Sequence, residues 1–178
     1  MQKDDGWFAE LFEQHRGAIF STALRLCGGR ADAEDLTAET FLRAYRAARD
    51  YDDARFSAIE PRPWLVTIVL NLWRNQRRTA ARRPRTRPIE PLDDPVQPGE
   101  GVEQQVLRHE TGDEMAELLA ELPEQQRIAI VLRHVADLPI VQIAAELGVP
   151  EGTVKSHISR GLGRLRTRYS STPEEATR

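Results

Sequence analysis

Two stretches of the chain carry basic side chains and no acid, a pattern expected of surfaces that bind phosphate groups. Residues 61–89 hold eight arginines and no carboxylate, and residues 152–168 hold five basic residues, again without a carboxylate. The whole chain nevertheless has a formal net charge of −3 and a pI near 5.9. Because the positive charge is concentrated in two places, the sequence predicts two separate anion-binding surfaces on an otherwise acidic protein.

The first basic stretch continues a helix with two different faces. At about 100° per residue, an apolar face collects Leu65, Val66, Ile68, Val69, Leu72 and Trp73. A solvated charged face normally mixes both signs, so an opposite face without acids favours nucleic acid as its partner over simple solvation. Trp64 lies near the edge of the opposite, basic face, and we expect its ring to pack against the protein rather than to stack on a base. We call the opposite face the arginine stripe: Thr67, Asn71, Arg74, Arg78 and Arg82.

The second basic stretch lies on the last helix of a predicted helix-turn-helix. A short helix over Ile140 to Leu147 precedes Gly148, which suits a turn with positive φ, and a longer helix starts near Glu151. We expect Val154, Ile158, Leu162 and Leu165 to face inward. Hydroxyls and arginines on the outer face suit base edges and phosphates in a DNA major groove, with a ligand-free three-helix unit as the alternative. The outer face consists of Thr153, Ser156, His157, Arg160 and Arg164, with Lys155 and Ser159 at its edges.

The remaining pattern predicts an all-α fold of two small domains. Apolar residues recur at three- and four-residue steps, and no alternating strand pattern persists. Five prolines between residues 84 and 98 break any periodicity, which predicts a flexible linker. In the first domain we expect a loop over residues 50–63 before the third helix. The predicted boundaries are 1–83 for a helical domain, 84–102 for the Pro-rich linker, 103–170 for the helix-turn-helix domain and 171–178 for the tail.

Several classes of protein are disfavoured. The longest apolar run is about half of the ~20 residues that a membrane-spanning helix needs, and the N-terminus lacks the pattern of a signal peptide. The single Cys27 cannot form an internal disulfide. We therefore expect a cytoplasmic protein without membrane insertion. His109 and Asp113 are spaced as a pair of metal ligands, but no third ligand suggests itself, so we expect no enzyme, no metal and no cofactor.

Four segments together resemble the extracytoplasmic-function (ECF) RNA polymerase sigma factors, which direct bacterial polymerase to promoters. In chain order the segments read AEDLTAETFLRAYRA, PRPWLVTIVLNLWRNQRR, LPEQQRIAIVLRH and IAAELGVPEGTVKSHISRGLGRLR. The resemblance covers nearly the whole chain. It implies two helical domains, of which the first binds core polymerase and the promoter −10 element and the second reads the −35 element.

The resemblance also implies roles for particular residues. A coiled coil of the largest polymerase subunit would contact the AEDL helix through Asp35, Leu36, Glu39, Phe41, Leu42 and Arg43. The alternative is that these residues close the domain core, which is the favoured interpretation for Leu36 and Phe41. The −10 element would be bound and melted by Phe56, Arg62, Asn71, Arg74 and Arg78. The −35 element would be read by Thr153, Lys155, Ser156, His157, Ser159, Arg160 and Arg164.

The resemblance implies one further partner, and the sequence leaves a competing interpretation open. Sigma factors of this type are commonly held inactive by an anti-sigma factor, so we expect one here. The competing interpretation is a stand-alone helix-turn-helix transcriptional regulator, which binds duplex DNA without polymerase and has no use for the arginine stripe. Gly161 and Gly163 lower the helix propensity of the last helix by up to ~1 kcal/mol each, and close approach to DNA is one explanation for them.

Overall fold

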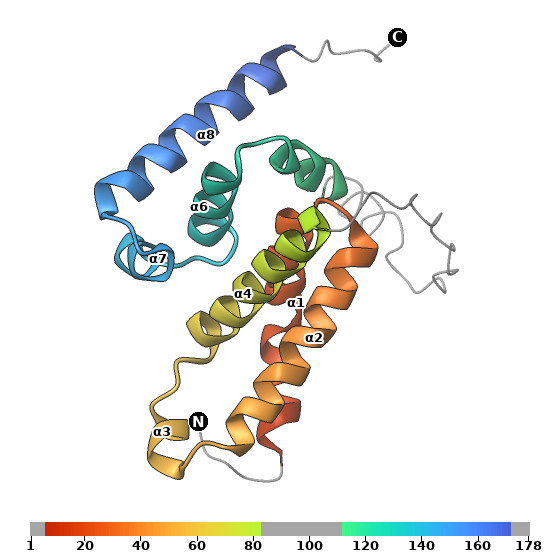
Figure 1. The fold of residues 1–178 in the computed structure, drawn as a ribbon, viewed down its shortest axis with the longest axis vertical. Coiled ribbons are helices and arrows are strands. Elements are labelled where there is room, and N and C mark those ends of the chain that lie inside the picture. The colour runs from red at the N-terminus through yellow and green to blue at the C-terminus, as the bar shows by residue number, and fades with distance from the viewer. Residues whose placement is uncertain (1–5, 83–111, 172–178) are drawn as a thin grey trace.

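The computed structural model describes residues 6–82 and 112–171, and all regular structure within these two ranges is helical. This result confirms the predicted all-α fold. The first range contains α1 (Trp7–Cys27), α2 (Arg30–Arg49), α3 (Asp53–Ser57) and α4 (Pro61–Arg82). The second contains a helical stretch over 112–120, then α6 (Glu124–His134), α7 (Ile140–Leu147) and α8 (Glu151–Ser171) (Figure 1). We call the two ranges the first and the second module. The predicted linker over 84–102 lies outside the described residues, so the domain boundaries stay a prediction.

Local sequence explains where the first two helices begin and end. The α1 helix stops at Gly28, whose φ of 83° is the left-handed conformation that glycine adopts without a steric penalty. The N–H of Gly28 donates to the carbonyl oxygen of Leu24 at 2.8 Å and so satisfies one of the last carbonyls of the helix. Asp32 lies in the first turn of α2, where a negative charge is favourable.

The expected loop over residues 50–63 is partly wrong. It contains the short helix α3, capped by Asp52, whose carboxylate accepts from the N–H of Arg55 at 2.7 Å. The next helix, α4, already begins at Pro61. Prolines at 61 and 63 are compatible with this start because the first-turn N–H groups of a helix have no partner within it.

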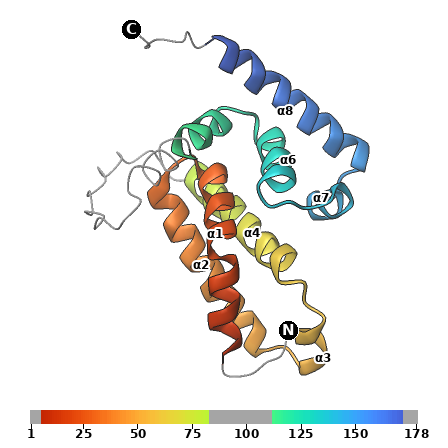
Figure 2. The ribbon, with the colours of Figure 1, turned by 180° about the vertical axis from the view of Figure 1, so that it is seen from behind.

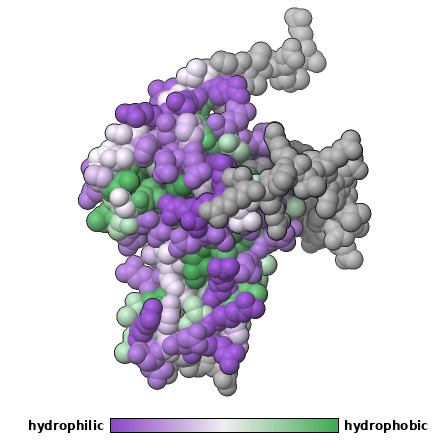
Figure 3. Space-filling view, viewed as in Figure 1, coloured by the Kyte–Doolittle hydropathy of each residue, from purple (hydrophilic) through white to green (hydrophobic). Residues whose placement is uncertain are grey.

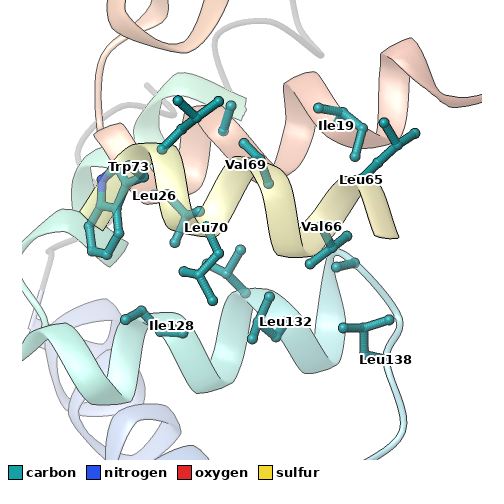
Figure 4. Packing of buried hydrophobic residues seen from close by; sticks show 14 of the residues in the cluster. Ile19, Leu26, Leu65, Val66, Val69, Leu70, Trp73, Ile128, Leu132 and Leu138 are labelled. Carbon is teal, nitrogen blue, oxygen red and sulfur yellow. The ribbon is translucent and has the colours of Figure 1, made fainter. Parts of the chain in front are cut away.

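The α4 helix lies at the centre of the molecule and is buried on two sides. Figure 4 shows Leu65 and Val69 among side chains of α1, while Val66, Leu70 and Trp73 point towards Ile128 and Leu132 of α6. These residues belong to one continuous cluster of buried apolar side chains that draws on both modules. Leu70 is also fully buried, although the predicted apolar face did not include it. Because α4 packs against both α1 and α6, it buries a wider face than one neighbouring helix would cover.

The second module covers one side of the first, and α8 lies on the far side of α6. The two ribbon views agree that α6 and α7 run beside α4 and that α8 crosses α6 at the end of the molecule opposite α3 (Figures 1 and 2). The visible surface is mostly hydrophilic over both modules, with small apolar areas between polar side chains (Figure 3). The α8 helix therefore presents its outer face away from the first module.

Candidate nucleic-acid interface

The arginine stripe borders an open depression between α2, α4 and α6. Asn71 and Arg78 are exposed, and Arg74 is half-buried. The depression has a volume of about 850 Å³. Its lining combines three predicted −10 residues, one predicted polymerase residue and three that were not singled out: Asn71, Arg74 and Arg78, then Arg43, then Asn75, Arg77 and Glu124. The structure thus gathers six side chains that can donate hydrogen bonds to an anion, from two helices, around one concave surface, which suits a phosphate backbone.

Acids from the second module lie against this stripe. A carboxylate oxygen of Glu146, on α7, accepts a hydrogen bond from the Thr67 hydroxyl at 2.7 Å, and its other oxygen lies 3.9 Å from the Arg74 guanidinium. Glu124, at the start of α6, forms an ion pair with Arg77 at 3.2 Å. The sequence of α4 is free of acids here, but in the folded chain Glu146 faces the stripe and Glu124 faces Arg77 beside it.

Two further arginines connect the modules through carbonyl oxygens. Arg62, one of the predicted −10 residues, donates to the carbonyl oxygen of Val135 at 3.3 Å. Arg127 is 3% exposed and donates to the carbonyl oxygen of Leu26 at 3.0 Å, near the C-terminus of α1 where a positive charge is favourable. Its guanidinium also lies 5.2 Å from the ring centroid of Trp73, within the range of a cation–π contact. Burial, and then the charge of Arg77, lower the pKa of Arg127.

Three predicted contact residues lie inside the first module instead of on its surface. Phe56 is fully buried and meets Trp7 edge-on at 5.2 Å between ring centroids. Leu36 is fully buried and Phe41 is 2% exposed, packed on Phe12 at 4.9 Å. In this structure all three side chains are part of the core, where burial of apolar area stabilises the fold, as the alternative interpretation of Leu36 and Phe41 expected. Trp64 is partly buried against the core, as expected.

The other predicted polymerase residues share the exposed face of α2. Asp35, Leu42 and Arg43 are exposed, and the half-buried Glu39 is paired with Arg43 at 2.8 Å. Sequence reasoning did not single out Tyr45, which is 38% exposed and stacks on Trp7 with 6.0 Å between ring centroids. The spacing of Leu42 and Tyr45 along the helix could have indicated an exposed apolar strip.

The helix-turn-helix forms as predicted. Gly148 has a φ of 65°, and the following N–H, of Val149, donates to the carbonyl oxygen of Ala144 at 3.1 Å to close the turn. Val154 is fully buried against the rest of the module. Five predicted −35 residues are exposed on α8 and two are half-buried: Lys155, Ser156, Ser159, Arg160 and Arg164, then Thr153 and His157.

One inward position of α8 was predicted incorrectly. Leu162 was expected to face inward but is 42% exposed, whereas Gly161 is buried. A Cβ at Gly161 would lie 2.5 Å from the Cδ1 of Ile130 and 3.3 Å from the Cβ of Gln126, so any larger residue there requires Ile130 to move. This contact inside the module accounts for Gly161 without DNA. Nothing crowds a Cβ at Gly163.

The described residues offer little support for other kinds of site. Within residues 6–82 and 112–171, no group of three His, Cys, Asp or Glu side chains is placed to hold a metal ion, and His109 lies outside these ranges. Among the helices described, none combines the length and the apolar character that crossing a bilayer requires. Across the same residues, no carboxylate is paired with Lys155, Arg160 or Arg164.

Comparison with known proteins matches two separate segments of the chain to two family models. Residues 11–83 match the family described as Sigma-70 region 2, and residues 112–165 match Sigma-70, region 4. The chain is 37% identical over 161 residues to the ECF RNA polymerase sigma factor SigE of Mycolicibacterium smegmatis, covering 88% of this chain and 59% of that relative's length. It is 31% identical over 156 residues to the ECF RNA polymerase sigma factor SigL of Mycobacterium tuberculosis, covering 88% of this chain and 85% of that relative. With SigW of Bacillus subtilis the identity is 29%, over 92% of this chain and 89% of the relative.

Two solved structures share the fold. The sigma factor RpoE, crystallised with the anti-sigma factor NepR from Bartonella quintana, aligns with a TM-score of 0.67 over 94% of this chain and 99% of that one. CnrH in complex with the cytosolic domain of CnrY aligns with a TM-score of 0.65 over 96% of this chain and 92% of that one. Both are 22% identical to this chain, so the likeness concerns the fold.

Proposed function

The chain belongs to the ECF RNA polymerase sigma factors, and we propose that it binds core RNA polymerase, recognises the −35 and −10 promoter elements and promotes promoter melting. The observation that carries the proposal is the presence of two basic helical surfaces on two modules, one within each Sigma-70 match. One protein with two such surfaces can hold two separated DNA elements at a fixed spacing once core polymerase binds it.

Core polymerase is proposed to dock on the exposed face of α2. Asp35, Glu39, Leu42 and Arg43 offer charges and one apolar side chain, a mixture that suits an interface that forms and separates. Tyr45 extends this face with a partly exposed aromatic ring, the residue type most enriched where binding energy concentrates. The partner proposed from the family is a coiled coil of the largest polymerase subunit.

The −10 element is proposed to lie along the arginine stripe. Asn71 supplies both a donor and an acceptor to a base, and Arg62, Arg74 and Arg78 supply charge to the backbone. Melting costs a few kcal/mol for each unstacked base, which contacts to a displaced base and to the single strand can offset. Phe56 is left out of this set because it is fully buried.

The −35 element is proposed to be read as duplex by α8. Lys155, Ser156, Ser159, Arg160 and Arg164 are exposed on one helix, with Thr153 and His157 beside them, so the helix can enter a major groove. Arginine can bind the two acceptors of a guanine edge together, whereas hydroxyls accept or donate to several bases.

Two other aspects of the function are proposed from the family. RpoE, which has this fold, was crystallised with the anti-sigma factor NepR, and CnrH, which also has it, is in complex with the cytosolic domain of CnrY. An anti-sigma factor is therefore expected to hold this chain inactive. The chain is proposed to act in the cytoplasm with polymerase, through binding and without catalysis of its own.

The test is run-off transcription on fragments of the organism's own genome with purified bacterial core polymerase. A discrete start site that appears only when the protein is added supports a sigma factor. Asn71→Ala should then lose initiation on templates that depend on the −10 element, and Arg160→Ala on those that depend on the −35 element. Arg16→Ala, which removes an exposed arginine of α1, serves as the control. Absence of initiation, together with tight duplex binding without polymerase, would favour a stand-alone regulator.

A further inference from the structure

Gly163 lies in the interior of α8, and nothing in the folded chain explains why this position has no side chain. A glycine inside a helix lowers its stability relative to alanine, so it normally stands where the backbone needs a positive φ or where another element approaches closely. The φ of Gly163 is not positive, and the helix continues beyond it to Ser171. Apart from its own helix backbone, no described atom would lie within 4 Å of a Cβ at this position. The glycine therefore has a cost within the protein and no counterpart there.

The position lies on the outer face of α8, in a gap that hydrogen-bond donors surround. On a helix surface, the neighbours of a residue are three and four positions away. For Gly163 these neighbours are all exposed: Ser159, Arg160, Arg166 and Thr167. No carboxylate among the described residues is paired with Arg160 or Arg166. Two guanidinium groups and two hydroxyls thus border a place where the helix backbone is bare.

The distance along α8 decides what this gap meets on DNA. Under the proposed function the first turn of α8 enters the major groove and contacts base edges. At 1.5 Å per residue, the axis from Glu151 to Gly163 spans about 18 Å. The major groove is only ~12 Å wide, so the outer face passes beyond the bases before it reaches Gly163. At this turn of the helix the nearest groups on a duplex are the phosphates along the edge of the groove.

We infer that Gly163 is the point where α8 approaches a phosphate of the −35 duplex most closely, with Arg160 and Arg166 holding that phosphate from either side. This inference rests on the proposed function, because it concerns the helix assigned to the −35 element. Guanidinium groups are well suited to phosphate oxygens, and a missing Cβ lets the helix backbone come nearer to the strand. Phosphate contacts fix the position of a protein on DNA without reading its sequence. Gly163 accordingly sets how deeply α8 lies in the groove, whichever bases it reads.

Gly17 provides a matched control for this position. It lies in the interior of α1, it is exposed, and no described atom beyond its own helix backbone would lie within 4 Å of a Cβ there. Alanine should therefore stabilise the helix equally at positions 17 and 163. The two positions differ in that only Gly163 belongs to the surface proposed to bind DNA.

The experiment compares stability with DNA binding in the full-length protein, free of polymerase. The variants are Gly163→Ala, Gly163→Leu, Gly17→Ala and Arg160→Ala. Thermal unfolding followed by circular dichroism gives the Tm of each. Fluorescence anisotropy gives the affinity for a short fluorescein-labelled duplex of mixed sequence, measured at several low salt concentrations. A duplex of mixed sequence is sufficient because phosphate contacts do not depend on the bases.

We expect Gly163→Ala and Gly17→Ala to raise the Tm by similar amounts, because each replaces a helical glycine without crowding. Gly163→Ala should nevertheless weaken duplex binding by roughly tenfold and make it less dependent on salt, as the loss of a phosphate contact does. Gly163→Leu should weaken binding further, and Gly17→Ala should bind like the unaltered protein.

Two results would overturn the inference. One is a Gly163→Ala variant that is stabilised but binds the duplex as tightly as Gly17→Ala. The other is a lower Tm for Gly163→Ala, because the glycine would then have a role inside the protein. Arg160→Ala separates this inference from the proposed function. Unchanged binding in Arg160→Ala would contradict the assignment of α8 to the −35 element, whereas a loss there with unchanged binding in Gly163→Ala would remove only the close approach at Gly163.

Discussion

The arginine stripe of α4 and the outer face of α8 look alike in the sequence, but in the folded protein their charges have different surroundings. On α8, Lys155, Arg160 and Arg164 are exposed, and no carboxylate of the described residues is paired with them. On α4, Arg74 already faces Glu146, and the neighbouring Arg77 faces Glu124. An acid-free stretch of sequence therefore identifies both surfaces, but it does not tell which of them is free to bind.

The largest expected effect tests whether Phe56 belongs to the core of the first module or to the surface proposed to bind the −10 element. Phe56→Ala should lower the free energy of unfolding by about 3–5 kcal/mol, because it removes a fully buried ring from the core of the first module. Urea denaturation measures the change. Tyr45→Ala, at a partly exposed ring, is the comparison and should cost less. A small loss of stability at Phe56 with a large loss of −10 binding would return this residue to the DNA surface.

The next effect compares the two surfaces directly. Arg160→Ala should weaken duplex binding to a −35 site by about 1–3 kcal/mol, both in the free protein and with polymerase, since a base contact is lost and no described carboxylate is paired with this arginine. Arg74→Ala should weaken −10 binding less in the free protein than with polymerase, because Glu146 already occupies this arginine when the modules are closed. Fluorescence anisotropy with and without core polymerase measures both. Equal losses at Arg74 in the two states would mean that the two surfaces are equally open.

A smaller effect tests the contact between the modules. Thr67→Val removes the hydroxyl that donates to Glu146 at 2.7 Å and should lower the free energy of unfolding by about 1 kcal/mol. Thr37→Val is the matched control, because its hydroxyl donates to the Ala33 carbonyl oxygen within its own helix at 2.7 Å. Urea denaturation of both variants separates a bond between modules from one within a helix. No loss of stability in Thr67→Val would contradict a stabilising bond between the modules.

The smallest effect concerns the dependence of stability on pH. Burial, with Asp32 adding to it and Arg127 opposing it, raises the pKa of the Cys27 thiol to about 12. The folded state thus holds the thiol proton of Cys27 more tightly than the unfolded chain, in which a thiol ionises at about pH 8.5. The contribution to stability is complete below that pH and is lost as the pH rises towards 12. Unfolding by urea at neutral pH and near pH 10 should show a steeper loss in the unaltered protein than in Cys27→Ala. An equal loss in both proteins would contradict the raised pKa.

Periodicity predicted most of the fold correctly. The turn at Gly148 and the helical character of residues 64–82 were predicted correctly, because both follow from residue types that act over one or two turns. The short helix α3 was missed because its signal is a single capping aspartate, Asp52, in a short stretch that ends in two prolines.

The placement of the modules depends on features that sequence patterns do not contain. Thr67 and Glu146 are 79 positions apart, and only the folded chain brings them together. The burial of Phe56 likewise depends on its contact with Trp7, which lies far away in the sequence at the start of α1. The resemblance assigned Phe56 to the −10 surface by its position in the chain, whereas exposure to solvent is a property of the packed domain.

The buried Gly161 on α8 has a consequence for promoter choice. A Cβ at this position would lie 2.5 Å from the Cδ1 of Ile130 and 3.3 Å from the Cβ of Gln126, so α8 rests closer to α6 than it could beside an alanine without movement of these neighbours. Where Ile130 does not yield by changing its rotamer, α8 has to shift on α6, and such a shift carries every side chain of the outer face with it. Under the proposed function, an atom that is absent from the interior of the protein thus helps to aim the residues that read the −35 element.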